Sequence, residues 1–188
     1  MSEQVKTDLS KFKNTWFKMG ASPLKVYAWY FAKEMFINSA FPFNGFRRFV
    51  LRLFGAKIGK GVILKPHVVI KFPWNLTVGD NVWLGESIWI ENQAKVTIEN
   101  NCCISQRAMI ITGNHDYRKE TFDLIIGEVI MKEGAWLGAD AKLCPGTIMQ
   151  SHSILTVGSV ASGILEPYSI YQGNMAVKIK DRKMETKQ

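Results

Sequence analysis

Aliphatic residues recur every six positions from residue 58 onward, with mostly polar or small residues between them. Three runs of three such positions begin 20 residues apart, and a run of six resumes after one interruption. A helix repeats its apolar face every 3.6 residues and a strand every two, so a period of six fits neither element alone. The fifteen positions are Ile58, Leu64, Ile70, Val78, Leu84, Ile90, Ile98, Ile104, Ile110, Met131, Leu137, Leu143, Met149, Leu155 and Ala161.

A six-residue period is typical of a triangular coil with three short strands and three sharp corners. One aliphatic residue per side points inward, and we expect glycine to supply backbone freedom at corners such as Gly59, Gly79, Gly85 and Gly138. Stacked coils bury a continuous core that a single coil cannot. The pattern predicts a parallel β-helix over residues 55–180.

Residues 1–54 follow a different pattern, that of helices and loops. Ser22 as N-cap and Pro23 at the first helical position predict a helix that runs to Ile37. A second helix is expected over residues 46–54, with its arginines away from its apolar face. That face consists of Phe46, Phe49, Val50 and Leu53.

The excess positive charge lies entirely near the N-terminus. Residues 1–60 hold 11 Lys or Arg and 3 Asp or Glu, whereas residues 61–188 hold 13 of each. Two interpretations are open for the aromatic, basic segment 1–54. Its apolar faces either pack on the rest of the protein or a neighbouring subunit, or they make a peripheral contact with an anionic membrane. No nucleic-acid partner is predicted.

Several features of the sequence predict a cytoplasmic protein. The N-terminus lacks the apolar core of a signal peptide, and the apolar stretch 26–37 is too short to span a membrane. The three cysteines, two of them adjacent, form neither a disulfide framework nor a metal-binding spacing. We therefore expect no metal, and a location in the cytoplasm, with the inner membrane surface as the place of any peripheral contact.

The single interruption of the repeat predicts an extruded loop at residues 112–129. Loops on rigid scaffolds often carry function, and this one contains His115. Neutral histidine can take a proton from an attacking hydroxyl near neutral pH. Asp116 or a backbone carbonyl can fix its tautomer, and Glu128 is a weaker candidate for orienting it. The alternative is an ordinary solvated loop histidine.

These residues resemble the hexapeptide-repeat acyltransferases, whose coils form a left-handed β-helix. Residues 133–179 resemble the closing coils and C-terminal cap of the acetyltransferase branch. Residues 44–62, NGFRRFVLRLFGAKIGKGV, are more specifically similar to the colanic-acid-biosynthesis acetyltransferases. One departure is Met175, which stands where the family usually has proline.

The resemblance implies a mainly β fold, a left-handed parallel β-helix with an N-terminal helical segment and a short C-terminal cap. The expected organisation is a helical segment at 1–54, the acetyltransferase domain at 55–180 and a basic tail at 181–188. It also implies an O-acetyltransferase that moves the acetyl group of acetyl-CoA to a saccharide hydroxyl in exopolysaccharide biosynthesis. His115 would be the general base.

The resemblance further implies two sets of binding residues. Those expected along the acetyl-CoA arm are Trp136, Gly138, Ala139, Val157, Gly158, Ser162 and Lys180. Glu86 and Ser87 match positions that contact sugar in related enzymes, and the nearby polar residues Asn92 and Gln106 are added as candidates for contact with the acceptor. For most of these residues a purely structural or solvated role at a coil corner is the competing interpretation.

The family's assembly implies a homotrimer with each site between two subunits. Three outward tryptophans, Trp74, Trp83 and Trp89, fit contacts with a neighbouring subunit or with the N-terminal segment. The acceptor is expected to be a saccharide or a lipid-linked saccharide.

Three other functions remain open from the sequence. One is N-acetylation of an amino-sugar nucleotide, because the same base serves an amine. Another is a γ-class carbonic anhydrase-like metalloenzyme, although His67, His115 and His152 lack the required H-x4-H pair. The last is a non-catalytic β-helix scaffold.

Overall fold

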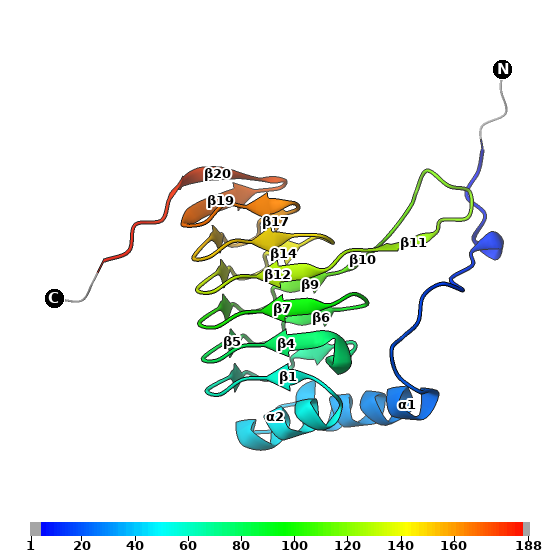
Figure 1. Ribbon diagram of the computed structural model, residues 1–188, viewed down its shortest axis with the longest axis horizontal. Coiled ribbons are helices and arrows are strands. Elements are labelled where there is room, and N and C mark those ends of the chain that lie inside the picture. The colour runs from blue at the N-terminus through cyan, green and yellow to red at the C-terminus, as the bar shows by residue number, and fades with distance from the viewer. Residues whose placement is uncertain (1–4, 186–188) are drawn as a thin grey trace.

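The computed structural model describes residues 5–185 and consists of a parallel β-helix with helices across one end (Figure 1). Each coil contributes one short strand to each of three sheets, which form the faces of a triangular prism. The predicted β-helix is therefore confirmed. The loop between Ile111 and Val129 leaves the prism as a separate two-stranded hairpin.

The strands fall into four groups. The six-stranded sheet contains β1 (Lys57–Ile58), β4 (Leu76–Val78), β7 (Val96–Ile98), β12 (Val129–Met131), β15 (Ile148–Met149) and β18 (Ile164–Leu165). The seven-stranded sheet contains β2 (Ile63–Leu64), β5 (Trp83–Leu84), β8 (Cys103–Ile104), β13 (Trp136–Leu137), β16 (Ile154–Leu155), β19 (Ser169–Gly173) and β20 (Ala176–Asp181). The five-stranded sheet contains β3 (Val69–Ile70), β6 (Trp89–Glu91), β9 (Met109–Ile111), β14 (Lys142–Leu143) and β17 (Val160–Ala161). The hairpin pairs β10 (Gly113–His115) with β11 (Leu124–Ile126).

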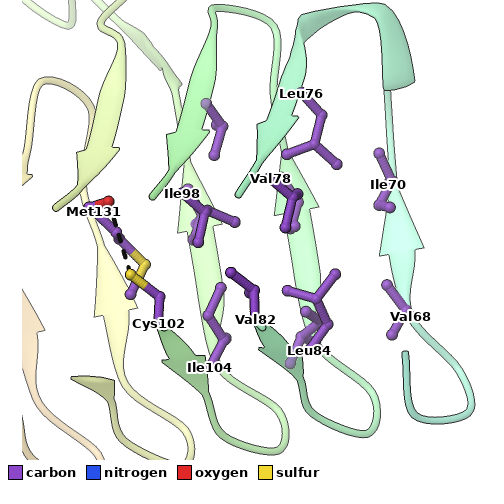
Figure 2. Packing of buried hydrophobic residues seen from close by; sticks show 14 of the residues in the cluster. Val68, Ile70, Leu76, Val78, Val82, Leu84, Ile98, Cys102, Ile104 and Met131 are labelled. Atoms are coloured by element: carbon purple, nitrogen blue, oxygen red, sulfur yellow. Dashed lines mark hydrogen bonds between the residues drawn. The ribbon is translucent and has the colours of Figure 1, made fainter. Parts of the chain in front are cut away.

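The interior of the prism is the aliphatic ladder that the six-residue repeat predicts. All fifteen repeat positions are buried, with at most 8% of any residue exposed. Parallel pairing aligns successive coils, so that Ile58 lies beside Val78 and Leu64 beside Leu84. Figure 2 shows the resulting rows of side chains, with Met131 filling one of the positions beside Ile98.

The corner glycines are explained by close packing rather than by backbone freedom. Gly59, Gly79, Gly85 and Gly138 do not have positive φ angles. A Cβ atom on each would instead lie 2.5–2.7 Å from backbone atoms of the next coil. The expectation about backbone freedom was wrong for these four positions.

The N-terminal segment contains two main helices, as predicted. The first runs through α1 (Pro23–Ala32) into a π-helical turn, η2 (Lys33–Ile37), and the Ser22 hydroxyl caps its start. The second is α2 (Asn44–Leu53). Short 3-10 turns occur at η1 (Leu9–Lys11) and η3 (Pro73–Asn75).

Of the predicted apolar face of α2, only Val50 is buried. Phe46, Phe49 and Leu53 are exposed, whereas Arg47 is only 2% exposed and packs toward the β-helix. The cause is the unpaired edge of the first coil. Backbone N–H groups of each coil donate to carbonyl oxygens of the next coil, for example from Gly59 to Val78. The carbonyl groups of the first coil therefore have no preceding coil to pair with, and buried carbonyls need donors.

Side-chain donors from the helices satisfy these carbonyl groups. Arg47 donates to the carbonyls of Leu64 and Lys65 at 2.7 and 2.9 Å, and also to those of Phe36 and Ile37. Arg48 donates to the carbonyl of Val62, and Arg52 donates to those of Ile58 and Gly59. The indole of Trp29 donates to the carbonyls of Ile70 and Lys71. The arginines thus close this end of the prism.

The other end is closed by an antiparallel hairpin of β19 and β20. The chain then folds back, because Arg182 donates to the carbonyl oxygens of Gly134 and His152 at 3.1 Å. Asp181 and Arg182, the first two residues of the predicted basic tail, therefore belong to the folded domain.

Two edges of the prism position the candidate chemistry. The groove edge joins the seven-stranded to the five-stranded sheet, at residues 85–87, 105–107, 138–140 and 156–158. The loop edge leads from the five-stranded sheet to the next strand of the six-stranded sheet, and the β10–β11 hairpin leaves the prism there (Figure 1). Within residues 5–185, no helix is both long and apolar enough to cross a membrane.

Candidate active site

His115 lies at the end of β10, on the arm of the hairpin that leaves the loop edge. Its backbone pairs with Leu124 of β11, and Gly113 pairs with Ile126 closer to the prism. Thr112 anchors the foot of the hairpin, because its buried hydroxyl donates to the carbonyl of Glu91 and accepts from the N–H of Ala94. The side chain of His115 is thus held away from the prism on a short, anchored arm.

The imidazole of His115 has a defined orientation. Its Nδ1 lies 2.8 Å from the carbonyl oxygen of Phe122, and the two rings stack with centroids 4.4 Å apart. A carbonyl oxygen only accepts hydrogen bonds, so Nδ1 carries the proton in the neutral ring. The lone pair is then on Nε2, which is the form a general base needs.

The carbonyl of Phe122 reaches His115 through an unusual backbone conformation. Phe122 has a φ of 49°, in the left-handed region that bulky residues rarely adopt. Such conformations cost about 1–3 kcal/mol and gather at functional sites. No sequence motif marks Phe122 for this role.

Neither Asp116 nor Glu128 bonds to the imidazole of His115. The carboxylate of Asp116 bonds to Arg118, with 2.9 Å between Oδ1 and Nε, and this pairing lowers the pKa of Asp116. The tautomer is therefore fixed by the Phe122 carbonyl, the second option that the sequence allowed, and not by Asp116. Glu128 is exposed at the foot of the hairpin, and its carboxylate has no hydrogen-bond partner among the described residues.

A segment that sequence analysis did not connect with the site lies against the hairpin. The chain before α1 runs beside it (Figure 1), where the N–H of Asp8 donates to the carbonyl of Glu120 and Lys11 pairs with the Glu120 carboxylate at 2.6 Å. The ring of Phe12 packs 5.7 Å from that of His115. This N-terminal segment forms one wall of the His115 site.

A long groove follows the seven-stranded sheet and the groove edge. Its two central cavities have volumes of about 410 Å³ each and share Ser105 and Gln106. One is lined by Trp83, Glu86 and Cys103, among others. The other is almost entirely apolar and is lined by Trp136, Gly138, Ala139 and Val157 among others.

Trp136 joins this groove to a third cavity near the C-terminus. Its indole N–H donates to the Ser105 hydroxyl at 2.9 Å, which fixes the ring along the groove. Beyond it, a cavity of about 630 Å³ is lined by Lys180, Arg182 and Lys183 as well as Trp136. The groove therefore changes from basic, through apolar, to mixed polar and aromatic along the prism.

Five of the seven predicted cofactor residues line this groove, namely Trp136, Gly138, Ala139, Val157 and Lys180. Gly138 is also required by coil stacking, since a Cβ atom there would lie 2.7 Å from the N atom of Val157. Gly158 occupies a left-handed corner with a φ of 67°. Ser162 follows β17 at the loop edge, so the structure does not bring it to the groove.

Three of the four predicted acceptor residues lie at the groove, and the fourth does not. Glu86, Ser87 and Gln106 lie on the groove edge, and Glu86 and Gln106 line its first cavity. Asn92 was predicted wrongly. It is fully buried, and its amide bonds to both the N–H and the carbonyl of Phe72, so its role is to hold two coils together.

The other candidate groups are separated from one another. Trp74 contacts the N-terminal segment through a hydrogen bond to the carbonyl of Met19, whereas Trp83 and Trp89 are exposed on different sheets. His67 lies at the groove edge, His115 in the hairpin and His152 on the third edge, stacked on Tyr168. Among residues 5–185, no three His, Cys, Asp or Glu residues are grouped as metal ligands are.

His115 and the groove belong to different edges of one chain. The hairpin leaves the loop edge, whereas Trp136 and Ala139 line a groove on the seven-stranded sheet and the groove edge. A single chain therefore presents two separate features, the oriented imidazole of His115 and an elongated groove.

A related sequence identifies the family, although no protein-family model matches the chain. The sequence is 33% identical over 176 residues to the protein named as the colanic acid biosynthesis acetyltransferase WcaF of Escherichia coli (strain K12), covering 93% of this chain and 97% of WcaF.

Solved structures of hexapeptide-repeat enzymes share the fold. A hexapeptide-repeat acetyltransferase from Vibrio cholerae O1 biovar eltor, in complex with acetyl-CoA, matches with a TM-score of 0.78 at 18% identity, covering 88% of this chain and 92% of that one. A maltose O-acetyltransferase from Clostridium difficile 630 matches with a TM-score of 0.75 at 20% identity, covering 87% and 90%. The left-handed β-helix implied by the resemblance is thereby confirmed. This chain is an acetyltransferase that belongs to the WcaF family of hexapeptide-repeat proteins.

Proposed function

We propose that this protein transfers the acetyl group of acetyl-CoA to a hydroxyl group of a saccharide in exopolysaccharide biosynthesis. The observation that carries the proposal is the orientation of His115, whose Nδ1 faces the Phe122 carbonyl at 2.8 Å and leaves Nε2 free to accept a proton. The relationship to WcaF and the acetyl-CoA complex of the fold relative from V. cholerae support the choice of donor and acceptor.

In the proposed reaction Nε2 of His115 takes the proton of the acceptor hydroxyl as its oxygen attacks the thioester carbonyl. The negative charge passes to the carbonyl oxygen, where main-chain N–H groups at the coil corners are suited to stabilise it. The intermediate then collapses, the carbon–sulfur bond breaks, and the thiolate of CoA takes the proton back from Nε2. The products are an acetyl ester and CoA.

The groove suits the parts of acetyl-CoA in order. Lys180, Arg182 and Lys183 are positioned for the phosphates of the nucleotide end. The apolar cavity of Trp136, Ala139 and Val157 suits the pantetheine arm. In the proposed reaction acetyl-CoA is a co-substrate, and no step requires a metal ion.

The acceptor is proposed to lie toward the Trp83 end of the groove. Glu86 and Gln106 provide polar groups there, Ser87 lies at the same edge, and the exposed ring of Trp83 offers an apolar surface for one face of a sugar. A saccharide, free or lipid-linked, fits this mixture of groups, and the lipid-linked form would be acetylated at the inner face of the membrane.

We also propose that the active protein is a homotrimer with its sites between subunits. The separation of His115 from the groove supports this, because the hairpin of one subunit can reach the groove of the next when prisms pack side by side. Symmetric closed assemblies are the usual form of soluble oligomers.

The test is an acceptor screen with acetyl-CoA labelled in its acetyl group. Free oligosaccharides, nucleotide sugars and lipid-linked glycans are offered, CoA thiol release is measured, and the product is examined by NMR. An acetyl ester on a saccharide is the predicted result. An acetamide product would favour N-acetylation, and failure of acetyl-CoA to raise the melting temperature would favour a scaffold.

A further inference from the structure

The helices at the end of the prism expose an apolar face on the side that points away from the β-helix. On α1, Val26 and Trp29 are buried, whereas Leu24, Tyr27 and Phe31 are 80%, 72% and 68% exposed. The exposed residues repeat at helical spacing on the opposite side from Trp29, whose indole caps the carbonyl of Ile70. Helix α1 thus has two apolar faces, one of which is in solvent.

Helix α2 extends the same outward face. Its inward side is fixed by Arg47, Arg48 and Arg52, which donate to the carbonyl groups of the first coil. This arrangement forces Phe49 and Leu53, which are 55% and 66% exposed, to point away from the prism. An isolated amphipathic helix would prefer the opposite orientation, with its phenylalanines inside.

Both helices lie across the same end of the prism (Figure 1). Their exposed apolar residues belong to the surface of that end. We call this surface the helical base and define it by Leu24, Tyr27, Phe31, Phe46, Phe49 and Leu53. Large apolar side chains that gather in solvent at one end of a protein are typical of an interaction site.

The charge around the helical base identifies its partner. Residues 19–65 contain eight Lys or Arg residues, of which Arg47, Arg48 and Arg52 donate to carbonyl groups of the first coil. Glu34 is the one acidic residue in this range, and it pairs with Lys33. Lys57 and Lys60 are exposed on the first coil, next to the base. A second copy of the base would bring like charges together, whereas an anionic surface would complement them.

We propose that the helical base docks on an anionic phospholipid bilayer, with the axis of the β-helix directed away from the membrane. The aromatic and leucine side chains enter the interfacial layer, and the lysines around them contact lipid headgroups. This inference is independent of the proposed reaction, because it rests on the helices and not on His115 or the groove.

The experiment is co-sedimentation of the full-length protein with vesicles. Vesicles of phosphatidylcholine with 30 mol% phosphatidylglycerol (about the anionic content that reveals charge-assisted binding) are compared with vesicles of phosphatidylcholine alone. We expect binding to the anionic vesicles, and at least about tenfold weaker binding for the variant Phe49→Ser/Leu53→Ser, since burying a large apolar side chain contributes about one to two factors of ten. The charge variant Lys57→Glu/Lys60→Glu should weaken binding to the anionic vesicles specifically.

Val177→Ser is the matched control, because Val177 is 64% exposed on β20 at the opposite end of the prism. It should bind vesicles like the unaltered protein, and circular dichroism should show that all variants are folded. Equal pelleting of the unaltered protein and Phe49→Ser/Leu53→Ser would overturn the proposal. A change of oligomeric state in that variant, without vesicle binding by the unaltered protein, would also overturn it and would identify the base as a contact between copies.

Discussion

The imidazole of His115 stacks on the ring of Phe122 and has its Nδ1 2.8 Å from the carbonyl oxygen of the same residue. One residue therefore fixes both the plane of the histidine and its tautomer. The Phe12 ring, 5.7 Å away, adds a further wall from the N-terminal segment. A solvated loop histidine would have no reason to be held in this way, and the arrangement favours a catalytic role.

Arg47 should be the residue of α2 that contributes most to stability. Its guanidinium donates to four backbone carbonyls and is buried. Arg47→Leu leaves those carbonyls without donors and should reduce the free energy of unfolding by about 3–5 kcal/mol. Urea unfolding followed by circular dichroism measures this change. Arg48→Leu, which loses a single bond to the Val62 carbonyl, should cost about 1 kcal/mol, and equal losses would contradict the account.

Trp136 should contribute to cofactor affinity. Its ring lines both the apolar and the basic cavity, so Trp136→Ala should weaken acetyl-CoA binding by about tenfold or more. Trp136→Phe keeps apolar surface but loses the bond to Ser105, and should have an intermediate effect. Isothermal titration calorimetry measures both. Trp16→Ala removes a tryptophan of similar exposure in the N-terminal segment and should leave the affinity unchanged.

The cysteines should differ in their reactivity toward iodoacetamide. Burial raises the pKa of Cys102 to about 12 and also raises that of Cys103, which lines the first groove cavity. Because the thiolate is the reactive form, a raised pKa means slow alkylation at neutral pH and faster alkylation as the pH rises. Peptide mass mapping should find Cys103 modified before Cys102, with the rate increasing above pH 8. Rapid alkylation of Cys102 at pH 7 would contradict the buried position.

Sites between subunits predict complementation between two inactive variants. His115→Ala removes the proposed general base, and Ala139→Trp blocks the apolar cavity of the groove. Mixed trimers contain sites with an intact histidine from one chain and an intact groove from the other. If the variants mix at random, about a quarter of the sites should be active. Activity of co-expressed, co-purified chains is the measurement, and complete inactivity of a verified mixed oligomer would show that each site lies within one chain.

The sequence predicts the β-helix well because its repeat reports directly which side chains face the core. All fifteen repeat residues are buried, including Met131 and Met149, which depart from the usual aliphatic pattern. The corners were predicted less well. His67, Ser87, Arg107 and Asp140 take left-handed conformations with φ of 56–58° at the groove edge, where composition alone favours glycine.

The errors at the site have a common origin in long-range contacts. Asn92 looks like a polar corner residue, but Phe72 of the preceding coil turns it inward. Arg47 is on the polar side of α2 by helical periodicity, yet the carbonyls of the first coil bury it. Periodicity describes a single element, whereas these roles depend on the unpaired groups that the neighbouring coil presents.

The most direct test of the catalytic assignment is the turnover number of His115→Ala with acetyl-CoA and an acceptor identified by the screen. The value of kcat should fall by roughly 100-fold to 10,000-fold, as removal of a general base usually causes. Acetyl-CoA affinity and melting temperature should remain close to those of the unaltered protein, because His115 is on the hairpin and does not line the groove. A folded His115→Ala variant that retains full turnover would contradict the central claim.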